Sequence, residues 1–163
     1  MSLPRVYPIV GSAAWVRRLA ALGVRLVQLR IKAQPPECVE AEIRAAHACC
    51  RAHAAQLIVN DYWQLALQAG CDFVHLGQGD LADADLPGLR RAGVRLGIST
   101  HDEAELERAL AASPDYVALG PIYPTLLKVM PWQPQGLARL TRPRRPRATR
   151  ACALRDPRRA QCR

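Results

Sequence analysis

The chain has 163 residues, half of them apolar, which is enough for one sizeable hydrophobic core but hardly for two. Its formal net charge of +9 would by itself suggest a nucleic acid or an anionic membrane as partner. The excess, however, lies at one end, because residues 139–163 hold 10 arginines and one aspartate, whereas residues 1–138 hold 13 basic and 13 acidic residues. The neutral body disfavours a nucleic-acid partner. No run of residues reaches the roughly 18 apolar residues of a membrane helix and no leader peptide is recognisable, so we expect a cytoplasmic protein without a membrane partner.

The six cysteines show neither a CxxC pair nor the spacing of a zinc site. In a cytoplasmic protein this pattern favours reduced, partly buried thiols over disulfides.

Six short runs rich in valine, isoleucine and leucine predict strands of a parallel sheet, which are apolar almost throughout because both faces are covered. They begin near Tyr7, Leu26, Leu57, Phe73, Leu96 and Tyr116.

Segments with the periodicity of helices separate these runs. Residues 37–54 place Val39, Ile43 and Ala46 on one face, and residues 102–112 follow a T-x-x-E capping box formed by Thr100 and Glu103. Glycines at 23, 70 and 93 suit the left-handed residues that end helices. Strands and helices therefore alternate along the chain, as in a parallel sheet with right-handed crossovers.

Both a doubly wound sheet and a (β/α) barrel fit this alternation. Polar residues at the ends of the predicted strands favour the barrel, where all carboxyl ends open at one mouth. They are Gln28, Arg30, Asn60, Asp61, His75, Gln78, Ser99, Thr100 and the segment 121–128. No GxGxxG or Walker A stretch follows the first strand, which argues against a dinucleotide or P-loop site. We predict an α/β fold of the (β/α)8 TIM-barrel type, incomplete, with about six βα units in residues 1–140.

The residues at this mouth predict a site for a polyanion with its metal ion. Arg30 and Lys32 lie two residues apart and can bind a phosphate or carboxylate group, and Lys128 adds a third cation. Asp61 and Asp80 follow neighbouring strands, so their carboxylates can share one Mg²⁺. Each residue also has a simpler interpretation, since an aspartate after a strand often caps the next helix and a lysine at a strand end is often only solvated.

Four segments of the chain strongly resemble the thiamine phosphate synthases. They are GVRLVQLRIK (23–32), LIVNDYWQLALQAGCDFVHLGQGDL (57–81), LGISTHDEAE (96–105) and YVALGPIYPTLLKVMPWQPQGL (116–137), and the resemblance extends from Tyr7 to Leu140. It implies a TIM barrel that condenses hydroxymethylpyrimidine diphosphate with a carboxythiazole phosphate, giving thiamine monophosphate, pyrophosphate and carbon dioxide. These two small molecules are then the expected partners.

The resemblance also implies a role for each site residue. Gln28 would contact the pyrimidine, and Asp61 and Asp80 would bind Mg²⁺. The diphosphate would be held by Arg30, Lys32, Asn60, Ser99 and Lys128, while Thr125 and its neighbours would face the thiazole phosphate. Arg30, Lys32 and Lys128 would stabilise the charge that grows on the leaving pyrophosphate, so no protein nucleophile is needed.

Two departures from the family pattern bear on activity. Leu127 stands in PTLLK where the family usually has a hydroxyl residue, which removes one hydrogen bond to the thiazole phosphate. Residues 141–163 are rich in arginine, with prolines at 143, 146 and 157, where the family continues with its last βα units. We expect this basic tail to be disordered, and interpret it as the product of a frameshift or, less favourably, as a polyanion-binding extension. A barrel lacking two strands would expose unpaired strand edges, which predicts impaired activity, low stability and self-association.

Two other functions stay open at this level. One is a thiazole tautomerase-like barrel that binds a thiazole phosphate without coupling it, and the other is an inactive remnant whose tail binds nucleic acid.

Overall fold

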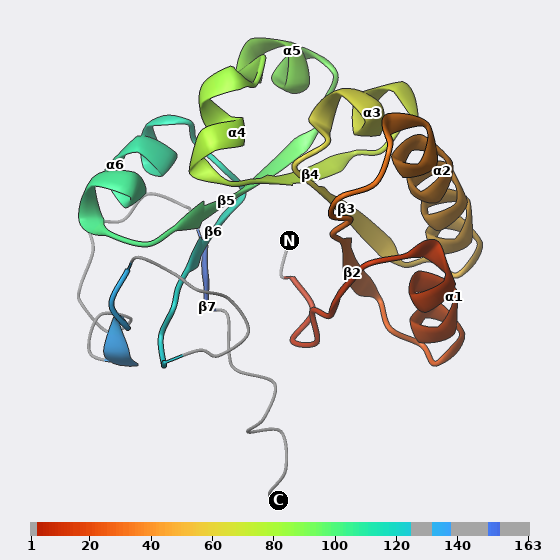
Figure 1. The fold of residues 1–163 in the computed structure, drawn as a ribbon, viewed down its shortest axis with the longest axis horizontal. Coiled ribbons are helices and arrows are strands. Elements are labelled where there is room, and N and C mark those ends of the chain that lie inside the picture. The colour runs from red at the N-terminus through yellow and green to blue at the C-terminus, as the bar shows by residue number, and fades with distance from the viewer. Residues whose placement is uncertain (1–2, 125–131, 138–149, 154–163) are drawn as a thin grey trace, which may run out of the picture. The chain divides into compact units, whose positions relative to one another are not determined.

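The computed structural model describes residues 3–124, 132–137 and 150–153. The chain falls into two compact units, residues 1–96 and residues 97–163. Each unit is built from strands and helices that alternate along the chain (Figure 1).

The first unit contains four parallel strands, β1 (Ile9–Val10), β2 (Leu26–Leu29), β3 (Gln56–Asn60) and β4 (Phe73–Leu76). Each pairs with the next, with Ile9 beside Gln28, Val27 beside Leu57, and Asn60 beside His75. Every residue of β2 and β4 is buried, as expected for strands covered on both faces. The first four predicted strands are therefore confirmed.

The described residues of this unit form five helices. They are α1 (Ala13–Ala21), α2 (Pro36–Ala52), α3 (Trp63–Gln68), α4 (Gln78–Asp83) and α5 (Leu86–Arg91). Figure 1 shows α1, α2 and α3 side by side along one face of β2, β3 and β4. Val39, Ile43 and Ala46 of α2 are fully buried, as their spacing predicts. Gly23, Gly70 and Gly93 follow α1, α3 and α5 with positive φ angles of 83°, 72° and 72°, which confirms their predicted role in ending helices.

A polar network joins the amino ends of β3, β4 and the first residue of β5. The Arg95 guanidinium donates to Asp72 Oδ2 at 2.7 Å and to the Gln56 side chain, and Gln56 Nε2 donates to Asp72 Oδ1 at 2.8 Å. The guanidinium also lies 4.4 Å from the centre of the Phe73 ring. Burial alone would raise the pKa of the Asp72 carboxyl, but the hydrogen bonds from Gln56 and Arg95 and the charge of Arg95 outweigh it and lower that pKa. The network fastens three segments that are distant in sequence at the end of the strands away from the predicted site.

The second unit contains the rest of β5 (Arg95–Thr100), α6 (Glu103–Ala111), β6 (Tyr116–Leu119) and β7 (Arg150–Ala153). These strands are parallel as well, and the register places Ser99 beside Ala118 and Ala118 beside Cys152. The last two predicted strands are thus confirmed, and α6 buries Leu106 and Ala109.

The predicted capping box of α6 is wrong by two residues. Thr100 is the last residue of β5 and is fully buried, where its hydroxyl donates to the Ala118 carbonyl at 3.2 Å. Asp102 caps the helix instead, since its Oδ1 accepts from the Glu105 amide at 2.8 Å. Thr100 has the right residue type for a cap, but the continuing strand already uses its side chain in the core.

One short segment of the basic tail belongs to the sheet, as a strand that the sequence did not predict. Residues 150–153 form β7, which lies parallel to β6. The prolines at 143, 146 and 157 do not interrupt this short segment, and a strand at the edge of a sheet needs only backbone hydrogen bonds on one side. Residues 138–149 and 154–163 lie outside the described residues.

Within the described part of the chain, no helix combines the length and the apolar character that crossing a membrane requires.

Candidate functional site

The carboxyl ends of β2, β3 and β4 bring three predicted site residues together. Lys32 lies three residues past β2, Asp61 directly follows β3, and Asp80 lies in the first turn of α4, which follows β4. Lys32 Nζ donates to Asp61 Oδ2 at 2.8 Å, in an ion pair whose side chains are 56% and 20% exposed. Parallel strands place these side chains at the same edge of the sheet, which accounts for the meeting of residues 19 to 48 positions apart in the chain.

Asp61 and Asp80 also contact one another. Partial burial raises the pKa of the Asp80 carboxyl, and the negative charge of Asp61 and a hydrogen bond between the two carboxyl groups raise it further, while Lys32 lowers it. Two carboxylates this close repel each other and favour either a shared proton or a shared cation. The predicted sharing of one ion by Asp61 and Asp80 is therefore compatible with their geometry.

The backbone at Asp61 is held in an uncommon conformation. Its φ angle is 65°, in the left-handed region that residues other than glycine seldom adopt. The Asp61 amide donates to the His75 carbonyl of β4 at 2.9 Å, and its own carbonyl accepts from the Trp63 amide at 2.8 Å. Asp61 does not cap α3, because Tyr62 occupies that position and makes no side-chain cap hydrogen bond. The Asp61 carboxylate thus contacts Lys32 and Asp80 and does not cap the following helix.

Two buried polar residues support this edge of the sheet. Asn60, the last residue of β3, is 5% exposed, and its register partner His75 on β4 is also 5% exposed. Burial lowers the pKa of His75 to about 4, with Asp61 opposing this shift and Arg30 adding to it. His75 is therefore neutral at physiological pH and lies near both Asp61 and Arg30, as expected for a packed residue behind the site and not for a base.

Gln28 is held by a partner that the sequence did not indicate. It lies on β2 and is only 2% exposed, and its Nε2 donates to the Tyr7 hydroxyl at 2.7 Å. Tyr7 comes just before β1, whose residue Ile9 pairs with Gln28. From the sequence alone, a tyrosine just before a strand indicates only a preference for β structure. The parallel pairing of β1 with β2 is what brings Tyr7 to Gln28. Arg30 continues this strand end, with its amide bonded to the Val10 carbonyl at 2.8 Å.

The remaining predicted site residues belong to the second unit or lie outside the described residues. Ser99 is partly exposed on β5. Thr125, Leu127 and Lys128 fall in residues 125–131, which the structure does not describe.

Two of the four described cysteines, Cys50 and Cys71, are unsuited to nucleophilic chemistry. Cys50 and Cys71 are buried, and burial raises the pKa of the Cys50 thiol to about 12 and of the Cys71 thiol to about 11. Both are therefore protonated and poorly nucleophilic at physiological pH. No group of three or more histidine, cysteine or acidic side chains suited to a metal occurs in the described ranges, so a metal here would need ligands besides Asp61 and Asp80. Water and a substrate phosphate commonly supply such ligands to Mg²⁺.

Comparison with known proteins gives a consistent result. Residues 6–154 match the family model of thiamine monophosphate synthase, so the match extends past Leu140 and includes β7. The chain is 63% identical over 140 residues to the thiamine-phosphate synthase of Rhizobium etli, covering 86% of this chain and 69% of the relative. It is 53% identical over 137 residues to the thiamine-phosphate synthase of Salmonella newport, covering 84% of this chain and 65% of the relative. The chain thus spans about two thirds of the length of these relatives.

The fold is similar to that of a solved structure, the thiamine phosphate pyrophosphorylase of Pyrococcus furiosus. The two align with a TM-score of 0.63 at 24% identity, over 73% of this chain and 61% of the other. This likeness confirms the predicted α/β fold of the TIM-barrel type. On the combined evidence of the family model and the relatives, the chain belongs to the thiamine monophosphate synthase family.

Proposed function

We propose that the protein is a thiamine phosphate synthase, a transferase that joins hydroxymethylpyrimidine diphosphate to carboxythiazole phosphate and yields thiamine monophosphate, pyrophosphate and carbon dioxide. The observation that supports it most directly is the cluster of Lys32, Asp61 and Asp80 at the carboxyl ends of consecutive parallel strands. A diphosphate with its metal ion needs both signs of charge at one place, and this cluster supplies them.

The residues present fit a magnesium ion. Asp61 and Asp80 offer hard carboxylate oxygens, and partial burial together with the negative charge of Asp61 raises the pKa of Asp80. When bound, Mg²⁺ would neutralise part of the charge of a diphosphate. Lys32, which now pairs with Asp61, would turn to the diphosphate oxygens, since its side chain is more than half exposed and free to reorient.

The other predicted residues complete a site for the pyrimidine substrate. Gln28 would contact the pyrimidine ring, and its hydrogen bond to Tyr7 fixes how its amide is presented. Arg30, Asn60, Ser99 and Lys128 would bind the diphosphate, and Thr125 the thiazole phosphate, with Leu127 unable to add a side-chain hydrogen bond.

The reaction then depends on stabilising a leaving group. As the bond between the pyrimidine methylene and the diphosphate oxygen breaks, negative charge grows on pyrophosphate and positive charge on the pyrimidine. Arg30, Lys32 and Lys128 would stabilise that negative charge more in the transition state than in the ground state. The thiazole nitrogen then attacks the pyrimidine methylene and forms the carbon–nitrogen bond. The carboxylate of the thiazole leaves as carbon dioxide, and the electron pair of the broken carbon–carbon bond stays on the thiazole ring. None of these steps needs a nucleophile from the protein, in keeping with the protonated thiols of Cys50 and Cys71 and the neutral His75.

Calorimetric titration with hydroxymethylpyrimidine diphosphate, with and without Mg²⁺, tests the proposal. We expect binding that depends on Mg²⁺ in the parent protein and is lost in Asp61→Asn. Asp83→Asn is the matched control, because Asp83 is an exposed residue of α4 and its replacement changes the net charge equally. Binding that is independent of Mg²⁺, or equal loss in both variants, would remove the site assignment. Formation of thiamine monophosphate after addition of carboxythiazole phosphate then tests the coupling itself.

A further inference from the structure

A cluster of aromatic and polar side chains in the second unit has no role in the function proposed so far. It centres on His101, which follows β5 and precedes α6. The His101 amide donates to Glu105 Oε2 at 2.8 Å, and its ring Nδ1 lies 2.7 Å from the same oxygen. A carboxylate oxygen accepts hydrogen bonds, so Nδ1 carries the hydrogen. Glu105 is itself only 6% exposed, and its amide donates to the Asp102 cap, so a buried and hydrogen-bonded carboxylate holds the imidazole ring.

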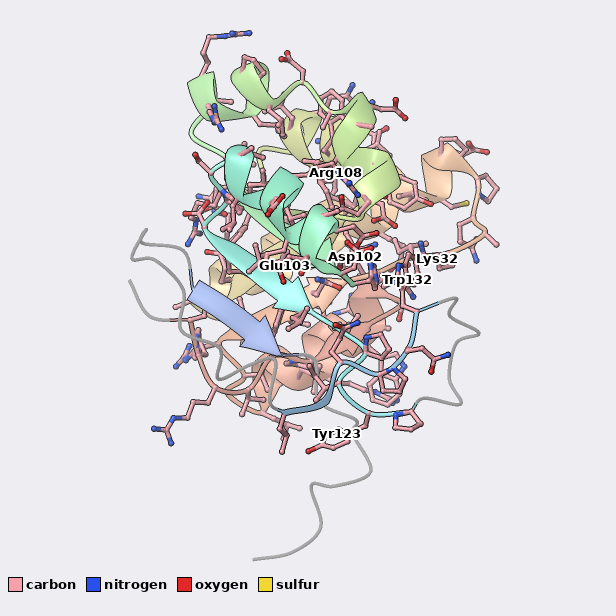
Figure 2. All side chains as sticks on the ribbon, turned by 90° about the vertical axis from the view of Figure 1, so that its left-hand side faces the viewer. Lys32, Asp102, Glu103, Arg108, Tyr123 and Trp132 are labelled. Carbon is pink, nitrogen blue, oxygen red and sulfur yellow. The ribbon has the colours of Figure 1, made fainter. Side chains whose placement is uncertain are left out.

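The imidazole ring of His101 stacks on the side chain of Trp132. The centres of the two rings lie 3.9 Å apart and their planes differ by 14°, which is a stacked arrangement. Figure 2 shows Trp132 beside Asp102 at the start of α6. Trp132 is 31 residues from His101 in the chain and comes after β6. The stack therefore ties the segment that follows β6 to the turn between β5 and α6.

Gln135 makes the second tie between these segments. Its Nε2 donates to the His101 carbonyl and, at 3.1 Å, to the Gln133 carbonyl. Its amide donates to the Pro121 carbonyl at 2.7 Å, and the Gly136 amide donates to the Ile122 carbonyl at 3.0 Å. The chain that leaves β6 at residues 121–122 is thus hydrogen-bonded to its own return at residues 135–136. His101 therefore contacts this segment twice, through the stack of its ring on Trp132 and through the hydrogen bond from Gln135 to its carbonyl.

We propose that His101 and Trp132 are positioning residues which, with Gln135, hold residues 132–136 against the end of β5, and that the binding of carboxythiazole phosphate depends on this contact. Thr125 and Lys128 lie in sequence between the two anchored points, Ile122 and Trp132. Anchoring both sides of a loop reduces the conformational freedom that binding must otherwise remove. The expected effect on substrate binding rests on the proposed function. The contact of Trp132 and Gln135 with His101 can be measured without any substrate.

The first experiment measures anchoring directly. In a background of Trp15→Phe and Trp63→Phe, Trp132 is the single tryptophan, and its accessibility is read from quenching of its fluorescence by acrylamide. We expect His101→Ala to increase the quenching constant severalfold and to accelerate tryptic cleavage after Lys128, while the more conservative His101→Gln has the smaller effect. Unchanged quenching and unchanged cleavage in His101→Ala would overturn the proposal.

The second experiment measures the consequence. In the otherwise unaltered chain, we expect Trp132→Ala to weaken the binding of carboxythiazole phosphate about tenfold and Trp132→Phe, which can still stack on imidazole, to restore it. Trp15→Ala is the control, since Trp15 is 52% exposed on α1 and contacts Arg18. Parent-like binding in Trp132→Ala, or equal loss with phenylalanine and alanine, contradicts the positioning role. If the parent protein binds neither substrate, the proposed function fails, and the quenching and cleavage measurements alone decide on the anchor.

Discussion

Lys32 and Asp61, at the ends of neighbouring parallel strands, form an ion pair with Nζ and Oδ2 2.8 Å apart. The same aspartate contacts Asp80 and raises the pKa of its carboxyl. Lys32 thus neutralises part of the negative charge of the two carboxylates in the absence of a metal ion. A cation that binds Asp61 would compete with Lys32 for this carboxylate.

Replacing Lys32 with methionine distinguishes its competition with a metal ion for Asp61 from its proposed contact with the diphosphate. Removal of a competing positive charge should leave the affinity for Mg²⁺ alone unchanged or higher. Binding of hydroxymethylpyrimidine diphosphate in the presence of Mg²⁺ should weaken about tenfold or more, as is usual when a hydrogen bond to a charged group is lost. Calorimetry measures both. Arg44→Met, which removes a surface pair with Glu40 on α2, is the control and should change neither.

Asp80→Asn should increase the thermal stability of the metal-free protein at neutral pH. The pKa of the Asp80 carboxyl is higher in the folded protein than the ordinary value of 3.8, so its ionised form destabilises the fold once the pH exceeds the raised pKa. The advantage of the variant should therefore vanish as the pH falls below 3.8. Adding Mg²⁺ should raise the melting temperature of the parent only. A variant less stable than the parent at neutral pH without metal would contradict the repulsion between Asp61 and Asp80.

Tyr7→Phe removes the acceptor of the Gln28 amide. Gln28 is 2% exposed, so a donor left without a partner should lower the free energy of unfolding by about 1 to 3 kcal/mol. Urea denaturation measures this loss. The double variant Tyr7→Phe, Gln28→Met should recover much of it, because neither partner is then left unsatisfied. Additive losses in the double variant would show that the hydrogen bond is not the cause.

Gly97→Ala should be among the most destabilising substitutions in the second unit. An added Cβ would lie 2.2 Å from ring atoms of Tyr116, which is fully buried on the neighbouring strand. Overpacking of this kind should lower the free energy of unfolding by about 3 kcal/mol. Gly79→Ala is the control, because a Cβ at that position meets nothing within 4 Å. Similar stability of the two variants would contradict the close packing of Gly97 on Tyr116.

Arg95→Met should lower stability without affecting the binding of substrate. It removes the partner of Asp72 and the contact with the Phe73 ring, both at the amino ends of the strands, and the expected loss is about 1 to 2 kcal/mol. Because the pKa of the Asp72 carboxyl is lowered in the folded protein, its contribution is present above pH 3.8 and is lost as the pH falls through the lowered pKa. The difference between parent and variant should therefore shrink in acid, and the pH dependence of urea denaturation checks this.

Much of the fold follows from local sequence patterns. Strands β2 and β4 are buried at every residue, so the apolar runs were sufficient to find them, and glycines with positive φ ended α1, α3 and α5 where predicted. The cap of α6 was misplaced because Thr100 and Asp102 are both good caps, and only the length of β5 decides between them. The strand at residues 150–153 was not predicted because its sequence, RACA, lacks the β-branched and aromatic residues typical of strands, and only its pairing with β6 reveals it.

The candidate site shows the same division. The order of the strands was enough to predict that residues following β2, β3 and β4 meet. The pairing of Lys32 with Asp61, the bond from Gln28 to Tyr7 and the stack of Trp132 on His101 depend on side-chain orientation. Each joins residues at least 21 positions apart, for which periodicity and motif spacing carry no information.

The left-handed backbone at Asp61 limits which amino acids this position can accept. Glycine adopts such a conformation without strain, and aspartate and asparagine adopt it more readily than most residues because their short polar side chains hydrogen-bond locally. Alanine also adopts it in this chain, at Ala33 and Ala54, at a cost of roughly 1–2 kcal/mol. Of glycine, aspartate and asparagine, aspartate alone has a carboxylate. The backbone conformation after β3 thus restricts which amino acids fit at position 61 without strain, independently of any role in binding. An alanine there would lose the carboxylate and add backbone strain at the same time, so asparagine is the replacement that reports on charge alone.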